Sequence, residues 1–170
     1  MEGTREECER AFERELAVSF TGHRAAKLPW GYDERDERCL AFKAKLEAEI
    51  IRAYRQGARY FLSGMADGVD LYAAESVLKL SHSFPEMKLV AVFPFGRGDT
   101  ERKRRCADRA YRVVSVCGEY APYAYMARNE YLVRHSSRII CGFTGEAASG
   151  TGATIRLASR EGIDIVILSI

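Results

Sequence analysis

Long hydrophobic runs are missing from this sequence, and none approaches the roughly 20 apolar residues that a helix needs to cross a bilayer. The first fifteen residues, MEGTREECERAFERE, carry charges of both signs and lack the basic start and apolar core of a signal peptide. We interpret residues 1–15 as a charged N-terminal extension, and we expect a cytoplasmic protein without a membrane partner. No internal repeat or linker interrupts residues 16–170, a length that suits one domain.

Cysteine is scarce, and no two of the five cysteines form a C-x-x-C pair. An odd count without paired spacing argues against a disulfide framework and against a zinc site, so we predict no bound metal. The formal net charge of +2 does not by itself indicate a nucleic-acid partner.

Charge of one sign gathers between residues 97 and 112, where seven basic residues outnumber three acidic ones. A basic cluster on one helix can attract phosphate, whereas a solvated helix face explains the same pattern without a ligand. No aromatic series accompanies this cluster, although stacking platforms usually accompany single-stranded nucleic-acid binding. A single-stranded nucleic-acid partner is therefore disfavoured, and a homo-oligomer stays open.

Short apolar runs alternate with helical patterns along the rest of the chain. The runs at 16–20, 60–62, 88–93, 113–116, 138–141 and 163–168 predict strands, and they are continuous, as in strands buried on both faces. Helical patterns occupy 36–57, 70–80, 100–112, 123–135 and 153–160, the first with Asp36 as its N-cap. Alternating βαβ units predict an α/β fold: a single Rossmann-like, doubly wound, mainly parallel sheet with helices on both faces.

Glycine is concentrated where the predicted strands end. TGHR at 21–24 follows the first strand, SGMADG at 63–68 the second, and SGTGAT at 149–154 comes after the fifth. Ligands of open parallel sheets bind beyond the carboxyl ends of the strands. Glycine admits backbone N–H groups to an oxyanion, and helix N-termini attract phosphate. A plain turn explains each loop alone, but their recurrence at one edge predicts a ligand that carries phosphate.

Two familiar phosphate-binding patterns are absent. Neither G-x-G-x-x-G nor G-x-x-x-x-G-K-[ST] occurs, which disfavours dinucleotide binding and ATP hydrolysis of those two types. Hydroxyl and guanidinium groups at the glycine-rich edge add donors for an anion. The candidate ligand-binding residues are Gly22, His23, Arg24, Ser63, Gly64, Met65, Gly68, Asp70, Arg128, Asn129, Ser149, Gly150, Thr151 and Thr154. We expect a β-branched residue at Gly64 or Gly68 to abolish ligand binding and to leave the protein folded.

Several of these candidates have a second interpretation. Asp70 stands where an N-cap belongs, and its carboxylate suits ribose hydroxyls equally well. A lone histidine such as His23 is more often a structural residue than a phosphate ligand or an acid. Arg128 and Asn129 lie in a helical pattern and point either to the site or into solvent.

Four motifs in order resemble the SLOG superfamily: SFTGHR at 19–24, SGMADGVDLYAAE at 63–75, RNEYLV at 128–133 and SGTGATIRLA at 149–158. This superfamily of Rossmann-like domains includes the DNA-processing protein DprA and the LOG cytokinin-activating enzymes. The chain is most similar to its bacterial YpsA-like branch, from about residue 16 to the C-terminus. The resemblance implies a doubly wound fold and a site for a nucleotide or nucleotide derivative.

The resemblance is incomplete at one motif. LOG enzymes carry P-G-G-x-G-T-x-x-E, whose glutamate supports cleavage of an N-glycosidic bond. Residues 149–156 here read SGTGATIR, with no glutamate at that spacing, which disfavours this activity and looks more like DprA.

Three functions follow. The first, which we favour, is regulatory binding or sensing of a nucleotide or nucleotide derivative, with no certain cofactor beyond that ligand. The second is hydrolysis of an N-glycosidic or phosphate bond, for which an acid or base is needed. Its candidates are Asp70, Glu75, Glu130 and Glu146, and none stands out. The third is DprA-like binding of single-stranded DNA through residues 102–112. Whether the protein is an enzyme stays open.

Overall fold

The computed structural model describes residues 11–170, so residues 1–10 of the predicted extension lie outside the described residues. The strands are β1 (Ala17–Gly22), β2 (Tyr60–Ser63), β3 (Lys88–Phe93), β4 (Arg112–Ser115), β5 (Arg138–Phe143) and β6 (Asp164–Ser169). The helices are η2 (Arg14–Leu16), η3 (Ala25–Lys27), α2 (Glu37–Arg55), α3 (Val69–Leu80), α4 (Glu101–Arg109), α5 (Ala124–Arg134) and α6 (Gly150–Glu161). Helices separate the consecutive strands, as predicted.

The six strands form one sheet in the order β4-β3-β2-β1-β5-β6, and every neighbouring pair is parallel. The α/β, doubly wound, Rossmann-like prediction is therefore confirmed. The chain builds outward from β1 to β4, then returns to the other side of β1 to form β5. The carboxyl ends of β1 and β5 consequently lie beside a topological switch point, where such folds bind ligands.

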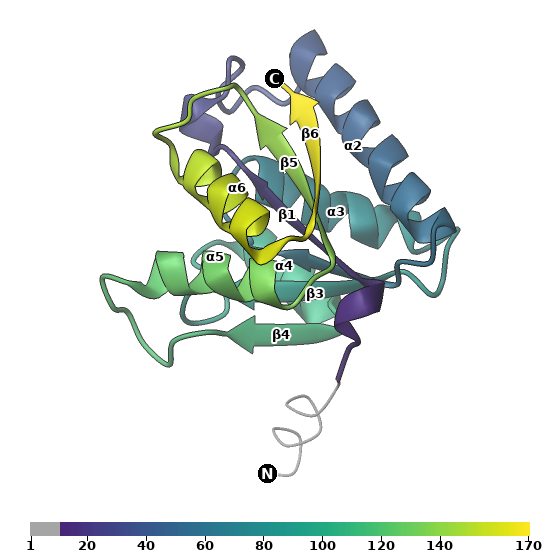
Figure 1. Cartoon of the computed structure of the whole chain (residues 1–170). Helices are drawn as coiled ribbons and strands as arrows, with labels where there is room; N and C mark the ends of the chain where they lie inside the picture. Colours follow the sequence, from purple (N-terminus) through teal and green to yellow (C-terminus); the bar gives the residue numbers. More distant parts are fainter. Residues whose placement is uncertain (1–10) are drawn as a thin grey trace.

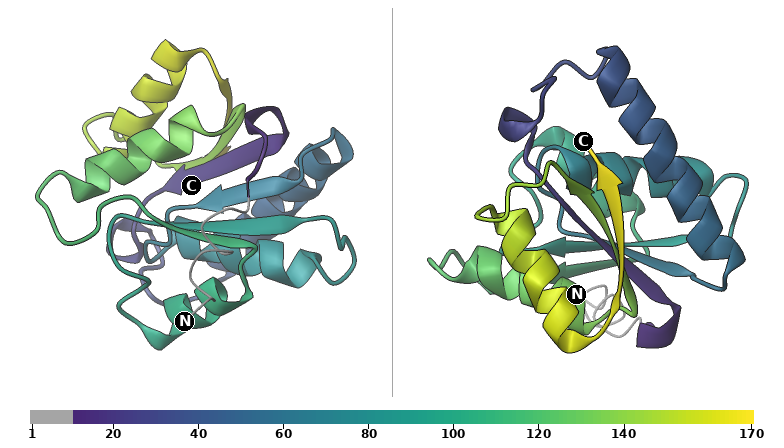
Figure 2. Two further views of the ribbon diagram at one scale, coloured as in Figure 1. Left: turned by 90° about the horizontal axis from the view of Figure 1, so that it is seen from below. Right: turned by 45° about the horizontal axis from the view of Figure 1, so that its top comes forward.

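Helices cover both faces of the sheet (Figure 1). In the view from below, α5 and α6 lie on one side and α3 and α4 on the other (Figure 2). Helix α2 packs beside α3, which places it on the same face as α3 and α4. Because both faces are covered, β1 and β3 are almost wholly buried, which explains their continuous apolar sequences. Of the described residues 11–170, no helix is long and apolar enough to cross a membrane.

Helix α2 follows its sequence pattern closely. Asp36 caps it by accepting the backbone N–H of Arg38 at 2.8 Å. Its apolar face, with Phe42, Leu46 and Ile50 fully or almost fully buried, contributes to the larger core between the sheet and α2 and α3. These residues recur at intervals of four, as one face of a helix requires.

Two helix boundaries differ from the prediction by three residues, and the others by two or fewer. Helix α6 begins at Gly150 rather than at 153, because the Ser149 hydroxyl caps it by accepting the N–H of Gly152 at 3.0 Å. Helix α4 ends at Arg109 rather than at 112, because the backbone N–H of Tyr111 already bonds to Leu89 of β3. Arg112 therefore belongs to β4.

Candidate functional site

A cavity of about 240 Å³ lies at the carboxyl ends of β2 and β3. Its lining residues are Arg24, Gly64, Met65, Ala66, Asp67, Phe93, Pro94, Phe95, Gly96, Arg97, Gly98, Asp99, Lys103, Tyr125 and Arg128. Three groups of these residues lie at strand ends: after β1, after β2 and around the end of β3. The others belong to helices α4 and α5. The cavity brings together four of the predicted ligand residues, Arg24, Gly64, Met65 and Arg128.

The loop after β2 is held in an unusual conformation. The Ser63 hydroxyl donates to the carbonyl of Asp70 at 2.7 Å and accepts the N–H of Met65 at 3.1 Å. Met65 has a φ of 60°, in the left-handed region that costs an ordinary side chain about 1 kcal/mol. Its side chain is almost fully buried, so packing holds this backbone in place. Strained backbone of this kind clusters at functional sites.

Arg128 and Asp70 meet beside Gly64. The Arg128 guanidinium donates to the Gly64 carbonyl and, at 2.9 Å, to the side chain of Asn129. A Cβ at position 64 would stand 2.8 Å from Asp70 Oδ2 and 2.9 Å from Arg128 Nη1. Glycine is therefore required here because two charged side chains converge over the backbone. Asn129 acts on the cavity through Arg128, since it does not line the cavity itself.

The Asp70 carboxylate is deeply buried. Burial raises its pKa, and the neighbouring Arg128 opposes that rise. Its Oδ2 accepts the Ala66 N–H at a long 3.4 Å, and within residues 11–170 its Oδ1 has no hydrogen-bond partner. A buried carboxylate with so few donors depends on the charge of Arg128. The charge of Asp70 in turn favours the protonated guanidinium that lines the cavity.

His23 joins the ends of β1 and β5. Its Nε2 accepts the backbone N–H of Thr144 at 3.2 Å, which assigns the ring proton to Nδ1, and its ring stacks on Phe143. Only 3% of His23 is exposed, and burial lowers its pKa, which keeps the imidazole neutral. His23 is thus placed as a structural link behind the cavity.

Two predicted glycines are required by packing. A Cβ at Gly22 would lie 2.3 Å from the Cβ of Val69, and one at Gly68 would lie 2.5 Å from the carbonyl oxygen of His23. Gly68 also has a φ of 97°. The expectation that a β-branched residue at Gly68 leaves the protein folded is therefore wrong, because it would collide with backbone that cannot move independently.

The loop after β5 is built as a helix cap. The Ser149 hydroxyl caps α6, Thr154 donates back to the Gly150 carbonyl at 3.0 Å, and Thr151 is buried in the first turn. A Cβ at Gly152 would stand 2.3 Å from the carbonyl oxygen of Ala147. None of residues 149–154 lines the cavity. This predicted loop therefore does not line the same cavity as the loop after β2.

The predicted acid or base candidates lie away from the cavity lining. Glu75 accepts from Arg102 at 3.0 Å, Glu130 stands 3.5 Å from Arg134, and Glu146 is exposed. Among the described residues, the carboxylates that do line the cavity are Asp67 and Asp99.

Both of these carboxylates face a lysine. Lys103 Nζ lies 2.8 Å from Asp99 and 3.7 Å from Asp67. The hydrogen bond from Lys103 lowers the pKa of Asp99, so this carboxylate stays ionised. Both carboxylates of the cavity lining are therefore ion-paired with Lys103.

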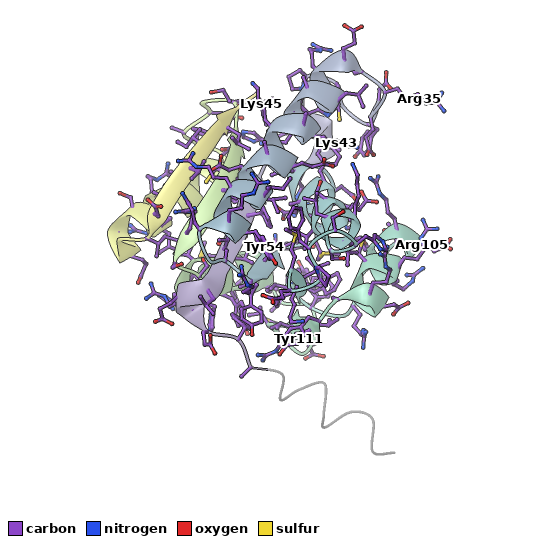
Figure 3. All side chains as sticks on the ribbon, turned by 90° about the vertical axis from the view of Figure 1, so that its right-hand side faces the viewer. Arg35, Lys43, Lys45, Tyr54, Arg105 and Tyr111 are labelled. Atoms are coloured by element: carbon purple, nitrogen blue, oxygen red, sulfur yellow. The ribbon has the colours of Figure 1, made fainter. Side chains whose placement is uncertain are left out.

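The basic cluster at 97–112 divides between two tasks. Arg97 and Lys103 line the cavity. Arg102 instead forms paired hydrogen bonds to Glu34 at 2.7 and 2.8 Å, which lower the pKa of Glu34 to about 2. Lys43 of α2 donates a hydrogen bond to the same Glu34. Figure 3 shows Lys43 on the side of α2 opposite Lys45, and it shows Arg105 projecting outward from α4. Arg102 therefore ties α4 to the segment just before α2.

Aromatic residues line one side of the cavity: Phe95 follows the third predicted strand and was expected at this edge, whereas Tyr120 and Tyr125 were not predicted. Phe95 and Tyr125 line the cavity with their rings 6.0 Å apart and nearly perpendicular, and Tyr120 meets Phe95 in the same way at 5.5 Å. The guanidinium of Arg24 lies 5.2 Å from the Tyr125 ring centroid. The available signal was YAPYAY at 120–125, which follows the fourth predicted strand and so belongs to the same edge of the sheet.

The fold and this edge cavity define a Rossmann-like α/β protein with its candidate site beyond the ends of parallel strands. Residues 18–161 match the YspA SLOG family, so the chain belongs to that family. A UPF0398 protein of Halalkalibacterium halodurans is 26% identical over 155 residues, covering 85% of this chain and 80% of that protein. UPF0398 proteins of Brevibacillus brevis and Bacillus velezensis are 22% and 20% identical, over 76% and 85% of this chain and 74% and 84% of theirs. These names state no activity.

Proposed function

We propose that this protein binds a nucleotide or nucleotide derivative in the cavity beyond β2 and β3, and that it acts as a sensor. The observation that carries the proposal is Arg128. This residue is only 5% exposed, yet it lines the cavity beside Arg24, Arg97 and Lys103. Four cations line this cavity together with two carboxylates, Asp67 and Asp99, and this excess of positive charge favours an anionic ligand.

The size of the cavity sets the part of the ligand that it holds. Its volume of about 240 Å³ is below the roughly 300–1,000 Å³ of usual small-molecule sites. A sugar phosphate or one nucleoside monophosphate unit matches this space better than a whole dinucleotide does. A larger derivative would extend out over the surface.

Sensing is favoured over bond cleavage because of the carboxylates. A hydrolase of this class needs a positioned acid or base. Within the described chain, Asp67 and Asp99 are the acidic groups of the cavity, and both face Lys103. A bound ligand that stays intact is the expected result.

The test is a thermal shift with nucleotides, dinucleotides and ADP-ribose, followed by native mass spectrometry of the mixture. A ligand that binds only the folded state raises the melting temperature by mass action. We expect stabilisation of the wild type, none of Arg24→Met, and full stabilisation of Arg134→Met, an exposed arginine of α5 outside the cavity. Equal stabilisation of both variants would contradict the site, and consumption of the ligand would replace a sensor with an enzyme.

A further inference from the structure

The cavity has an aromatic side in addition to its cationic one. Phe95 and Tyr125 line it, and Phe95 is also packed edge-on against Tyr120. Phe95 thus stands between two tyrosines and is nearly perpendicular to both, at 89° and 81°. We call Phe95, Tyr120 and Tyr125 the aromatic wall, in which Phe95 and Tyr125 line the cavity and Tyr120 extends the wall beyond it from Phe95.

The segment that carries this wall is unusually exposed for its composition. Tyr120 is 65% exposed, Tyr123 66% and Met126 67%. Large apolar groups that gather on a surface in this way mark interaction sites. Tyr120 contributes little to the core, so its place beside the cavity needs another explanation.

The positions of the cations decide which interaction fits. Arg24 stacks over Tyr125, so a guanidinium that can bind phosphate lies directly beside an aromatic ring. Arg128 lines the same cavity from α5. A ligand that satisfies both sides has an anionic group and a flat apolar group a short distance apart. A nucleotide has this form, whereas a sugar phosphate has only the anionic part.

We propose that the aromatic wall stacks the base of the nucleotide, with the phosphate on Arg24 and Arg128. This inference rests on the proposed function and deepens it, because it names the part of the protein that distinguishes a nucleotide from a sugar phosphate. Stacking on a ring face tolerates every base, since each has a π face. Purines therefore bind more tightly than pyrimidines because their face is larger, and selection among purines is weak.

Tyr120 offers a clean test because it is exposed and Tyr123 on the same segment is its match. Tyr123 has almost the same exposed fraction, and neither tyrosine lines the cavity. Tyr120 packs edge-on against Phe95, whereas Tyr123 makes no ring contact with the wall among the described residues. Truncation of either side chain removes little buried surface, so both variants are expected to fold. Tyr120→Phe keeps the ring and removes only the hydroxyl.

The experiment is isothermal titration calorimetry with AMP and ADP-ribose as base-bearing probes and ribose 5-phosphate as the base-free probe. We expect Tyr120→Ala to weaken the base-bearing probes by about tenfold or more. Ribose 5-phosphate should bind this variant as it binds the wild type. Tyr120→Phe and Tyr123→Ala should retain the wild-type affinities for all three probes.

Three outcomes would overturn the inference, and they are distinguishable. If ribose 5-phosphate binds the wild type as tightly as AMP does, the base contributes nothing to the affinity. If Tyr120→Ala and Tyr123→Ala have equal effects, the wall has no special role, although the cavity still binds its ligand. If the wild type binds none of the three probes while Arg24→Met behaves identically, the proposed function fails together with the inference.

Discussion

The loop after β2 and the loop after β5 each join a buried strand to the N-terminus of a helix, and each is rich in glycine and hydroxyl groups. The first lines a cavity in which Arg128, from a distant helix, comes to rest over Gly64. The second loop caps α6 with its own Ser149, and none of its residues 149–154 lines the cavity. Glycine creates the turn in both loops, but only a side chain supplied by another element turns one of them into part of a cavity.

The largest effect is expected from the two glycines that differ most in their surroundings. Gly68→Ala should lower the free energy of unfolding by about 3 kcal/mol, because of its positive φ and its contact with the His23 carbonyl. Gly150→Ala meets nothing within 4 Å and should be neutral or raise stability by about 0.5 kcal/mol. Urea unfolding measures both. Similar losses at both positions would mean that the two loops do not differ in packing.

The next effect concerns Arg128, the side chain that α5 contributes to the cavity. Arg128→Met should cost about 3 kcal/mol, because it leaves the buried Asp70 carboxylate without its countercharge. Adding Asp70→Asn to this variant should restore part of the loss, which a double-mutant cycle in urea would measure. Additive losses would show that the two side chains do not act as a pair.

A smaller effect separates stability from binding in the loop after β5. Ser149→Ala removes the cap of α6 and should lower stability by about 1 kcal/mol. Its ligand affinity should equal that of the wild type, because Ser149 does not line the cavity. If Ser149→Ala loses affinity in calorimetry while circular dichroism shows an intact fold, both loops contribute to ligand binding and the proposed difference between them is wrong.

The smallest effect is a pH dependence at His23, which links the start of one loop to the chain after β5. Burial lowers its pKa in the folded protein below the usual 6.5. As the pH falls below 6.5, the unfolded chain takes up a proton that the folded protein refuses, so stability present above that pH is lost on acidification. His23→Gln should show a flatter pH profile in urea unfolding from about pH 7 to 5. Parallel profiles would rule out this contribution.

The fold was predictable because its determinants are local. Continuous apolar runs identified every strand, and the cap and apolar face of α2 identified that helix. The sheet edge at which the glycine-rich loops gather followed from topology alone. The predicted helix boundaries were furthest from the structure where a single hydrogen bond sets the end of the helix. At Ser149, the hydroxyl cap starts α6 earlier than the apolar pattern predicts.

The cavity was only partly predictable because its residues meet through tertiary packing. Arg24, Gly64 and Met65 follow strands and could be proposed from position. Phe95 and Tyr125 come from segments 30 residues apart (125 − 95 = 30), and no spacing rule joins them. The reason for glycine at position 68 could not be predicted either, because a Cβ there would collide with the backbone of His23, a contact that only the folded structure reveals.

The position of β1 in the sheet has a consequence for how the chain folds. β1 lies between β2 and β5, and Val18 is in register with Arg138, 120 residues later (138 − 18 = 120). Pairings over such long separations form late and slowly. Until β5 arrives, the apolar β1 presents an open edge that can pair with another molecule. We therefore expect chains interrupted before residue 138 to aggregate, and a chaperone to be most useful in that interval.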